Sequence, residues 1–320
     1  MLKSFTFPTA PSECVEPVST GSSLVSKTAC YNIVSLLGRG AFGNVVKCVR
    51  ISDMKTVAVK MIKNEEPYNL CVKHEYAALS MLKQLDQDKC NIVRWNHIFM
   101  DKGYICLEFE RLHTSLHDFM GARVKPLSLC EIRPIIQQVA IALLHLQGIG
   151  LMHADLKLEN IMLVNHPKDP YKVKVIDFGL AVKLSDATVG TYTQSRYYRS
   201  PEVLLGLPLT TAIDVWSLGC VTAYLYLGWP LHCGSTEYNM LQSIVETHGA
   251  LPKNMIQKGV KTSTFFWWNV KTKCWTFKNP EQYQKDSKKE QIPEDLRKIR
   301  FPNLDALINV SISVAHSVKV

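Results

Sequence analysis

A carboxylate, an ammonium and a carboxamide stand close together in the segment from His153 to Asn160. Asp155 is followed by Lys157 two residues later and by Asn160 five residues later, and apolar runs flank the segment at residues 149–152 and 161–164. Phosphoryl transfer needs such a set: a group that positions the attacking hydroxyl, a cation for the transferred phosphate, and a metal ligand. On its own, however, the segment is equally typical of a polar turn between two strands.

A second carboxylate ends a strand-like run farther along the chain. Residues 173–176 are mainly apolar and lead into Asp177, Phe178 and Gly179. Carboxylate oxygens are hard ligands that suit Mg²⁺. A strand-end Asp in a turn is also common, so this segment too needs the support of its neighbours.

Glycines recur between two strand-like runs near the start of the chain. Gly38, Gly40 and Gly43 form a G-x-G-x-x-G pattern, with apolar residues before it at 33–37 and after it from Val45. Glycine lets a backbone approach phosphate oxygens closely. Because strands rather than a strand and a helix flank the pattern, a phosphate-covering hairpin is favoured over a dinucleotide fold. A Gly-rich turn without a ligand would read the same way.

A lysine and a glutamate are predicted to pair. Residues 56–60 alternate like a strand and end in Lys60. In the helix predicted next, Glu75 shares an apolar stripe with Val72, Tyr76 and Leu79, with Leu82 one turn on. A carboxylate on a buried face needs a partner, and Lys60 is the natural candidate. The alternative is an exposed lysine on a strand.

Bulk composition is that of a globular protein. The 320 residues are 47% hydrophobic and 20% charged, with a net charge of +9, which permits acidic partners without requiring them. Ten cysteines are scattered without a C-x-x-C pair, so reduced thiols are expected rather than a disulfide framework or a zinc site. No apolar stretch approaches the roughly 18 residues of a membrane span, and no signal-peptide pattern opens the chain.

The remaining sequence suggests how these segments are organised. Residues 1–28 are rich in Pro, Ser and Thr and are expected to be disordered. A strand is predicted over 104–110 and a helix over 129–146, with Pro134 near its start. The run from Ile213 to Leu227 is apolar almost all round, which is typical of a buried helix.

Taken together in this order, the motifs resemble those of protein kinases. His153-Ala154-Asp155 with Asn160 resembles the catalytic loop H-R-D-L-x-x-x-N, and the segments around the glycines, Lys60 and Asp177 resemble the other kinase signatures. Lys157, two residues after Asp155, resembles the lysine found at this place in serine/threonine kinases rather than the tyrosine-kinase version of the loop. Ala154, the 192–207 segment, residues 227–231 and the pattern at 261–266 resemble the homeodomain-interacting protein kinases, relatives of the dual-specificity tyrosine-regulated kinases.

The resemblance implies an α+β, two-lobed protein kinase fold. Residues 29–112 would form a small, mainly antiparallel β N-lobe with one key helix and the hinge, and residues 113–309 a larger, mainly helical C-lobe. Residues 310–320 would form a divergent tail. The family pattern can be followed to about Asn309, so we expect the C-lobe to lack its last helices. The chain would then be a truncated product, a splice form or an imperfect gene model.

The resemblance also assigns roles to individual residues. Asp155 would orient the substrate hydroxyl, Lys157 would neutralise the γ-phosphate, Ser195 would hydrogen-bond near both, and Asp214 would tie its helix to the catalytic loop. Asn160 and Asp177 would hold Mg²⁺. Phe109 would be the gatekeeper, and the backbone of Glu110 and Leu112 would meet adenine. The residues implied to bind ATP are Leu37, Gly38, Gly40, Gly43, Val45, Ala58, Lys60, Glu75, Phe109, Glu110 and Leu112.

Ala154 stands where most kinases have an Arg that grips an activation-loop phosphate. The loop must therefore be ordered in another way. Tyr192 is placed like the tyrosine that these families phosphorylate on themselves, and Arg196 and Arg199 could bind the phosphotyrosine. Alternatively, Tyr192 packs and both arginines face solvent.

Two departures from the family pattern bear on activity. Leu158 replaces the usual Pro, which packing of the loop should tolerate. Glu202, in a form of the A-P-E motif with Ser for Ala, finds no matching Arg for its usual ion pair. Loss of one member of such a pair typically costs about 3–5 kcal/mol.

The resemblance favours an active serine/threonine kinase that acts on Ser or Thr, often followed by Pro, in protein substrates. Transcription regulators are implied as partners, and the nucleus and/or cytoplasm as location. No direct nucleic-acid binding and no membrane association are expected. One rival is a catalytically impaired kinase-like binding or scaffold protein. Another, a DNA-associated regulator acting through its basic surface, lacks a recognisable reading element.

Overall fold

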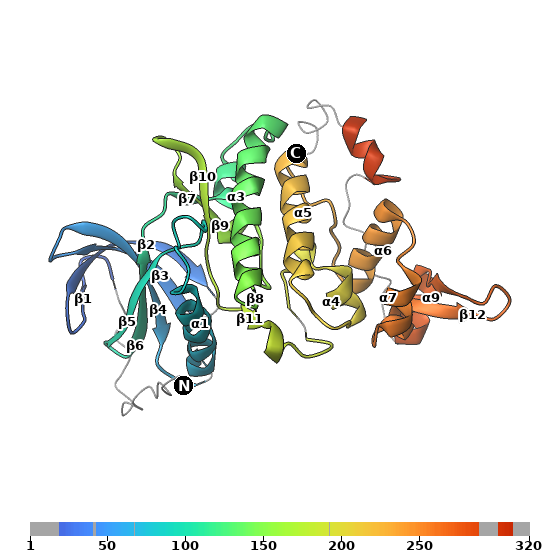
Figure 1. Ribbon diagram of the computed structural model, residues 1–320, viewed down its shortest axis with the longest axis horizontal. Coiled ribbons are helices and arrows are strands. Elements are labelled where there is room, and N and C mark those ends of the chain that lie inside the picture. The colour runs from blue at the N-terminus through green and yellow to red at the C-terminus, as the bar shows by residue number, and fades with distance from the viewer. Residues whose placement is uncertain (1–18, 41–42, 67, 192, 288–299, 310–320) are drawn as a thin grey trace. The chain divides into compact units, whose positions relative to one another are not determined.

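The computed structural model describes residues 19–40, 43–66, 68–191, 193–287 and 300–309. The described chain forms two compact units (Figure 1). Unit 1 lies within residues 1–83 and 93–112, and unit 2 within residues 84–92 and 113–320. The boundary after Leu112 falls where the hinge was predicted. The stretch 84–92 differs from expectation, because Asn91 and Ile92 pair with Val175 in unit 2.

Unit 1 is an antiparallel sheet with one helix. Its strand order is β1-β2-β3-β4-β6-β5. The β5–β6 hairpin turns through Lys102 and Gly103, whose φ values of 49° and 75° are those of a type I′ turn. The elements of unit 1 are β1 (Ser23–Val25), β2 (Cys30–Gly40), β3 (Gly43–Arg50), β4 (Lys55–Lys63), α1 (Tyr68–Leu82), β5 (Trp95–Asp101) and β6 (Tyr104–Glu110).

The strand β1 corrects the expectation that residues 1–28 are disordered. Ser23–Val25 pairs with Cys30–Asn32 of β2, and Leu24 is completely buried. This burial depends on contacts with Tyr31 and Ile33 in one apolar cluster, which local composition does not reveal. The rest of that prediction, for residues 1–18, lies outside the described residues.

The two faces of the sheet carry different side chains. Val57, Val59 and Met61 of β4 are buried in an apolar cluster on one face. Lys60 therefore points to the other face, because successive strand residues alternate. There it meets Glu75 of α1. The stripe predicted for α1 is buried at Val72, Glu75, Leu79 and Leu82, whereas Tyr76 is only half-buried.

Unit 2 is mainly helical, and its described residues also form one three-stranded and two two-stranded antiparallel sheets. Its elements are β7 (Thr114–Ser115), α2 (Leu116–Gly121), α3 (Leu129–Gly148), β8 (Leu151–Met152), η1 (Leu158–Asn160), β9 (Ile161–Asn165), β10 (Asp169–Val175), β11 (Val182–Lys183), η2 (Leu184–Asp186), η3 (Arg196–Tyr198), α4 (Pro201–Leu205), α5 (Ala212–Leu227), α6 (Glu237–His248), α7 (Lys253–Lys258), α8 (Thr262–Phe265), β12 (Phe266–Asn269), β13 (Cys274–Phe277), α9 (Pro280–Ser287) and η4 (Leu304–Asn309). The predicted elements at 104–110 and 129–146 are present, the latter extended by two residues.

The N-terminus of the helix α3 is stabilised by a capping interaction between Ser128 and Glu131. Glu131 in its first turn accepts hydrogen bonds from the backbone and the hydroxyl of Ser128, both at 2.8 Å, as in a capping box. By length and composition α3 could also span a membrane, contrary to the expectation from the sequence. Its buried residues, including Ile135, Val139 and Leu146, repeat at helical spacing, and core helices commonly pass the same test.

The helix α5 was predicted to be buried all round. Ile213, Leu218 and Val221 are buried, but Val215 on another side is 60% exposed. The helix thus has an apolar surface on a side that does not pack against the described chain.

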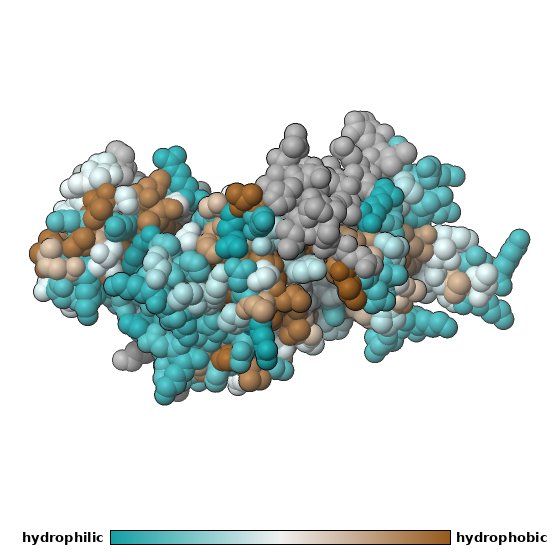
Figure 2. Space-filling view, turned by 90° about the horizontal axis from the view of Figure 1, so that it is seen from above, coloured by the Kyte–Doolittle hydropathy of each residue, from teal (hydrophilic) through white to brown (hydrophobic). Residues whose placement is uncertain are grey.

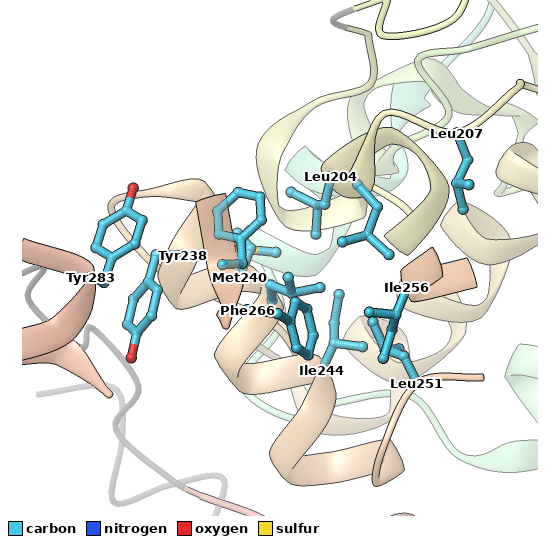
Figure 3. Close-up of a cluster of buried hydrophobic side chains, with 12 residues drawn as sticks. Leu204, Leu207, Tyr238, Met240, Ile244, Leu251, Ile256, Phe266 and Tyr283 are labelled. Atoms are coloured by element: carbon cyan, nitrogen blue, oxygen red, sulfur yellow. The ribbon is translucent and has the colours of Figure 1, made fainter. Parts of the chain in front are cut away.

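A second apolar core gathers the elements that follow the catalytic region (Figure 3). Tyr238 of α6 stacks on Tyr283 of α9, with ring centroids 4.4 Å apart. Phe266 of β12 meets Phe277 of β13 edge to face. Leu204 joins α4 to the same cluster. This core anchors the β12–β13 hairpin and the helices around it to the end of the activation segment.

Candidate active site

The carboxylate of Asp155 is the centre of the site in unit 2. It lies in the loop between β8 and β9, as predicted, and the residue is 6% exposed. Its Oδ1 accepts hydrogen bonds from Ser195 Oγ at 2.7 Å and from Ser195 N at 3.1 Å. Its Oδ2 lies 2.8 Å from Lys157 Nζ. The carboxylate is therefore fixed in one orientation.

Lys157 and Ser195 are also joined to each other. Lys157 Nζ donates to Ser195 Oγ at 3.1 Å. The expected contacts of Ser195 with both Asp155 and Lys157 are thus present. Ser195, which lies 38 residues after Lys157, therefore contacts both charged groups of the loop.

Asn160 and Asp177 offer oxygen atoms of the kind that Mg²⁺ prefers. Asn160 Nδ2 donates to the backbone carbonyl of Asp155 at 2.9 Å. This bond uses the amide nitrogen and leaves the Oδ1 of Asn160 as a possible metal ligand. Ile176 N donates to the carbonyl of Asn160 at 2.9 Å, so the residue before Asp177 is tied to the catalytic loop. Asp177 itself is exposed, with φ at 60°. This oxygen set fits a divalent cation.

His153 supports the loop from beneath. It is completely buried, and its Nδ1 accepts the N–H of Asp155 at 3.2 Å. The proton of the neutral ring must then sit on Nε2, which lies 3.0 Å from the carbonyl of Ile176. The ring also packs against the ring of Phe178, with the two centroids 4.9 Å apart. One imidazole therefore links the Asp155 loop to the segment that carries Asp177.

Asp214 of α5 makes the expected tie to the loop. Its two oxygens accept the N–H groups of His153 at 2.7 Å and Ala154 at 2.9 Å. Burial raises the pKa of Asp214, while the hydrogen bonds from these two N–H groups oppose the shift. These two hydrogen bonds help to hold Ala154 at a φ of 59°, a conformation that is costly for a residue with a Cβ.

Ala154, which stands where most kinases have an arginine, packs against apolar side chains. It is completely buried in a cluster with Met152, Val203, Leu209 and Ile213. The other members of that cluster are all apolar. The prediction that the activation loop must be ordered in another way is consistent with this packing.

The structure shows what orders part of that loop. The carbonyl of Ala154 accepts the hydroxyl of Thr193 and the N–H of Gln194, both at 3.0 Å. Gln194, 4% exposed, donates from Nε2 to the carbonyl of Ile213 and to Ser217 Oγ, both at 2.8 Å. These two residues were missed by sequence reasoning, because a polar residue in a loop gives no sign that it will be buried.

The activation-segment arginines differ from each other. Arg199 is 2% exposed and donates to the carbonyls of Thr193 at 3.1 Å and Gln194 at 2.9 Å. Arg196 is exposed. The alternative in which both face solvent is therefore wrong for Arg199, which already binds the backbone just after position 192. Tyr192 itself lies outside the described residues.

Glu202 lies in the first turn of α4 and is half-buried. Within the described chain, no cation pairs with its carboxylate.

In unit 1 the predicted ion pair is present. Lys60 Nζ lies 2.7 and 2.9 Å from the two carboxylate oxygens of Glu75. The two side chains are 16% and 4% exposed. The carboxylate on the apolar stripe of α1 thus found the partner that burial demands.

The sheet register gathers other predicted residues around Lys60. Val45 lies opposite Lys60, and Ala58 lies opposite Phe109, so all four share one face of the sheet. A Cβ on Gly43 would come 2.0 Å from the carbonyl oxygen of Met61. Only glycine fits there, whereas the space beside Gly38 is open and that beside Gly40 meets only the carbonyl of Gly43.

The hinge positions offer backbone groups. The N–H of Glu110 is taken by the carbonyl of Arg94 at 3.0 Å. The N–H of Leu112 donates to no acceptor in the described chain. Leu37, just before the glycines, is 37% exposed. These groups remain candidates for adenine contacts.

Comparisons with known proteins agree with this geometry. The protein kinase domain family matches residues 31–291. Homeodomain-interacting protein kinase 1 of Mus musculus is 44% identical over 91% of this chain and 24% of its own length. Homeodomain-interacting protein kinase 2 of Mesocricetus auratus is 43% identical over 91% of this chain and 25% of its own length. The human homeodomain-interacting protein kinase 4 is 38% identical over 91% of this chain and 48% of its own length.

These matches define the class first: the two units make up a protein kinase domain. The chain belongs to the protein kinase family, and over 91% of its length it is similar to the homeodomain-interacting protein kinases. It spans about a quarter of the length of the first of these relatives.

Proposed function

We propose that this chain is a serine/threonine protein kinase that transfers the γ-phosphate of ATP to Ser or Thr of protein substrates. The observation that carries the proposal is the cluster in which Asp155 contacts Lys157, Asn160 and Ser195. A single buried carboxylate beside one ammonium is suited to orient a hydroxyl next to a negatively charged phosphate.

In the proposed step, the substrate oxygen attacks the γ-phosphorus and the bond to the β–γ bridging oxygen breaks. The proton of the hydroxyl passes to Asp155, and ADP leaves. Lys157 neutralises charge on the transferred group, and Ser195 keeps the carboxylate and the ammonium in register. Most of the rate enhancement would come from this positioning.

Unit 1 would supply ATP contacts. Lys60, held by Glu75, would bind the α- and β-phosphates, and the backbone beside Gly38 and Gly40 would cover them. Mg²⁺, when bound, would neutralise charge between the β- and γ-phosphates. Asp177 and Asn160 are the residues that would hold it.

The proposal includes finer specificity that family resemblance supports. Acceptors would be followed by Pro, and Tyr192 would be autophosphorylated, with exposed Arg196 available to its phosphate. Comparing Ser-Pro with Ser-Ala peptides tests the first point. Tyr192→Phe with phosphotyrosine analysis tests the second; full activity together with unchanged phosphotyrosine would contradict it.

The relatives are named homeodomain-interacting protein kinases, which supports homeodomain transcription regulators as the proposed partners. The proposed location, nuclear and/or cytoplasmic, follows only from the resemblance of the sequence motifs. Binding of the purified chain to a homeodomain protein, with a kinase-unrelated DNA-binding protein as control, would test the partner. Fluorescence imaging of the tagged chain would test the location.

The deciding experiment uses radiolabelled ATP and a generic basic protein substrate. Asp155→Asn should reduce phosphate transfer to background while the protein stays folded. Asp186→Asn, which changes an exposed aspartate of η2 in the same unit, is the matched control and should retain activity. Equal background signal from the parent protein and Asp155→Asn would overturn the kinase assignment.

A second candidate function is a catalytically impaired kinase-like scaffold. The half-buried Glu202 without a cation in the described chain favours it, because an unpaired carboxylate weakens the segment that positions substrate. Under this alternative, ATP binding would persist without phosphate transfer.

A further inference from the structure

Part of one edge of the unit 1 sheet has no strand partner among the described residues. β1 covers β2 through Cys30–Asn32, and the backbone of Gly21 and Ser22 extends the cover to Ile33. From residue 34 to residue 40, β2 bonds only to β3 within the described chain. Such an edge presents N–H and C=O groups to any extended chain that approaches it.

The same stretch carries exposed apolar side chains. Val34 is 40% exposed and Leu36 is 45% exposed. Val25 of β1 and Ile51, the residue after β3, are each 48% exposed and lie beside Cys30 at the start of β2. Figure 2 shows apolar side chains gathered over this part of the sheet. An unpaired edge with apolar side chains is a feature that proteins otherwise avoid, so a binding role accounts for it.

A pocket of about 390 Å³ adjoins this edge. Its apolar wall is made by Ile33, Val46, Met61 and Tyr104, each of them less than 9% exposed. Its volume falls within the usual range of ligand pockets. Because Met61 and Lys60 point to opposite faces of β4, the pocket is distinct from the proposed nucleotide face.

The rim of the pocket is polar and basic. Arg39 and Asn44 line it and lie opposite each other in the β2–β3 hairpin. Both are exposed, and neither side chain makes a hydrogen bond or an ion pair within the described chain. Among the described residues that line the pocket there is no carboxylate. A guanidinium with free donors beside an apolar pocket is suited to a carboxylate carried next to an apolar group.

We propose that this edge binds an extended acidic peptide segment of a partner protein by strand addition. The peptide backbone pairs with residues 34–40 of β2, and one apolar side chain enters the pocket. An Asp or Glu two or four positions away, on the same face of the added strand, reaches Arg39. The three features lie along a single strand, which favours a peptide over a compact small molecule.

Arrayed nonapeptides incubated with the whole chain test this proposal without ATP, so the result is independent of phosphate transfer. One set carries an apolar residue at its centre and Asp or Glu two positions later, with the other positions randomised. A matched set carries Lys in place of the acid. We expect the acidic set to capture the chain preferentially. Equal capture of both sets, or of neither, would overturn the proposal.

Variants then locate the site on the best peptide, measured by fluorescence anisotropy. Arg39→Glu should weaken the acidic peptide about tenfold and favour its Lys counterpart. Lys271→Glu, at an exposed lysine in the β12–β13 turn, should change neither. An unaltered preference in Arg39→Glu would place the peptide elsewhere.

N-methylation of alternate peptide amides tests strand pairing without altering the protein. Methylating the amides that face β2 should weaken binding at least tenfold. Methylating the intervening amides should have little effect. Equal effects of the two patterns would exclude strand addition.

Discussion

The carbonyl oxygen of Ala154 accepts the N–H of Gln194 at 3.0 Å. This bond joins the catalytic loop directly to the activation segment. The side chain of Gln194 extends the link to α5 through Ile213 and Ser217, and its Oε1 accepts the N–H of Ser200 at 2.9 Å. A buried glutamine therefore orders the segment where many kinases use an arginine and a phosphate.

Gln194→Leu should destabilise the protein by about 2–3 kcal/mol, because it leaves the buried N–H of Ser200 without a partner. Urea unfolding measures the change. Gln242→Leu, which removes one exposed bond to Glu246, is the control and should cost less than about 0.5 kcal/mol. Equal costs would mean that the Gln194 network adds no stability.

Ala154→Arg should not restore the usual kinase arrangement. The new guanidinium would replace a methyl group that is completely buried among Met152, Val203 and Ile213. Burying an unpaired charge and overfilling a packed core together should cost about 3 kcal/mol or more. Thermal unfolding measures this. Ala154→Gly, which tolerates φ of 59°, should stay within about 1 kcal/mol. An Arg variant as stable as the parent would refute the packing argument.

Glu75→Gln should leave Lys60 with a neutral partner in a site where both side chains are largely buried. We expect a loss of about 2–3 kcal/mol in the free energy of unfolding and, if the proposed function holds, a marked fall in phosphate transfer. Glu65→Gln is the control, since its pair with Lys63 spans 3.7 Å and is about half exposed. That change should cost less than about 0.5 kcal/mol.

The stability of unit 2 should depend on pH through Glu131. Burial raises its pKa, but hydrogen bonds from Tyr171 and Ser128 outweigh burial and lower the pKa from 4.5 to about 2. The folded state then binds the proton less tightly than the unfolded state. The stabilisation is complete above pH 4.5 and is lost as the pH falls toward 2.

The expected size is about 2 kcal/mol after allowing for partial exposure. Unfolding free energies of the parent and Glu131→Gln, measured between pH 2 and 6, should differ most at the upper end of this range and converge toward pH 2. A constant difference across this range would show that Glu131 is not the titrating group. Glu281→Gln, at an exposed carboxylate of α9, should show no such convergence.

Local residue patterns were enough to predict the catalytic loop between two strands. They also gave the Lys60–Glu75 pair, because a carboxylate on an apolar helical stripe demands a partner. The contacts of Asp214 and Ser195 followed from resemblance alone. Spacing gave no sign of them, since both residues meet the loop from distant parts of the chain.

The sequence by itself determined which side chains could perform phosphoryl transfer and which class of fold could hold them, because motif order and periodicity are local properties. Only the tertiary structure decided the strand at Ser23–Val25, the placement of residues 84–92 in unit 2, and the burial of Thr193 and Gln194. Each of these depends on a partner far away in the sequence. A polar residue is stable in the interior only when such partners satisfy its hydrogen bonds, and no local pattern records them.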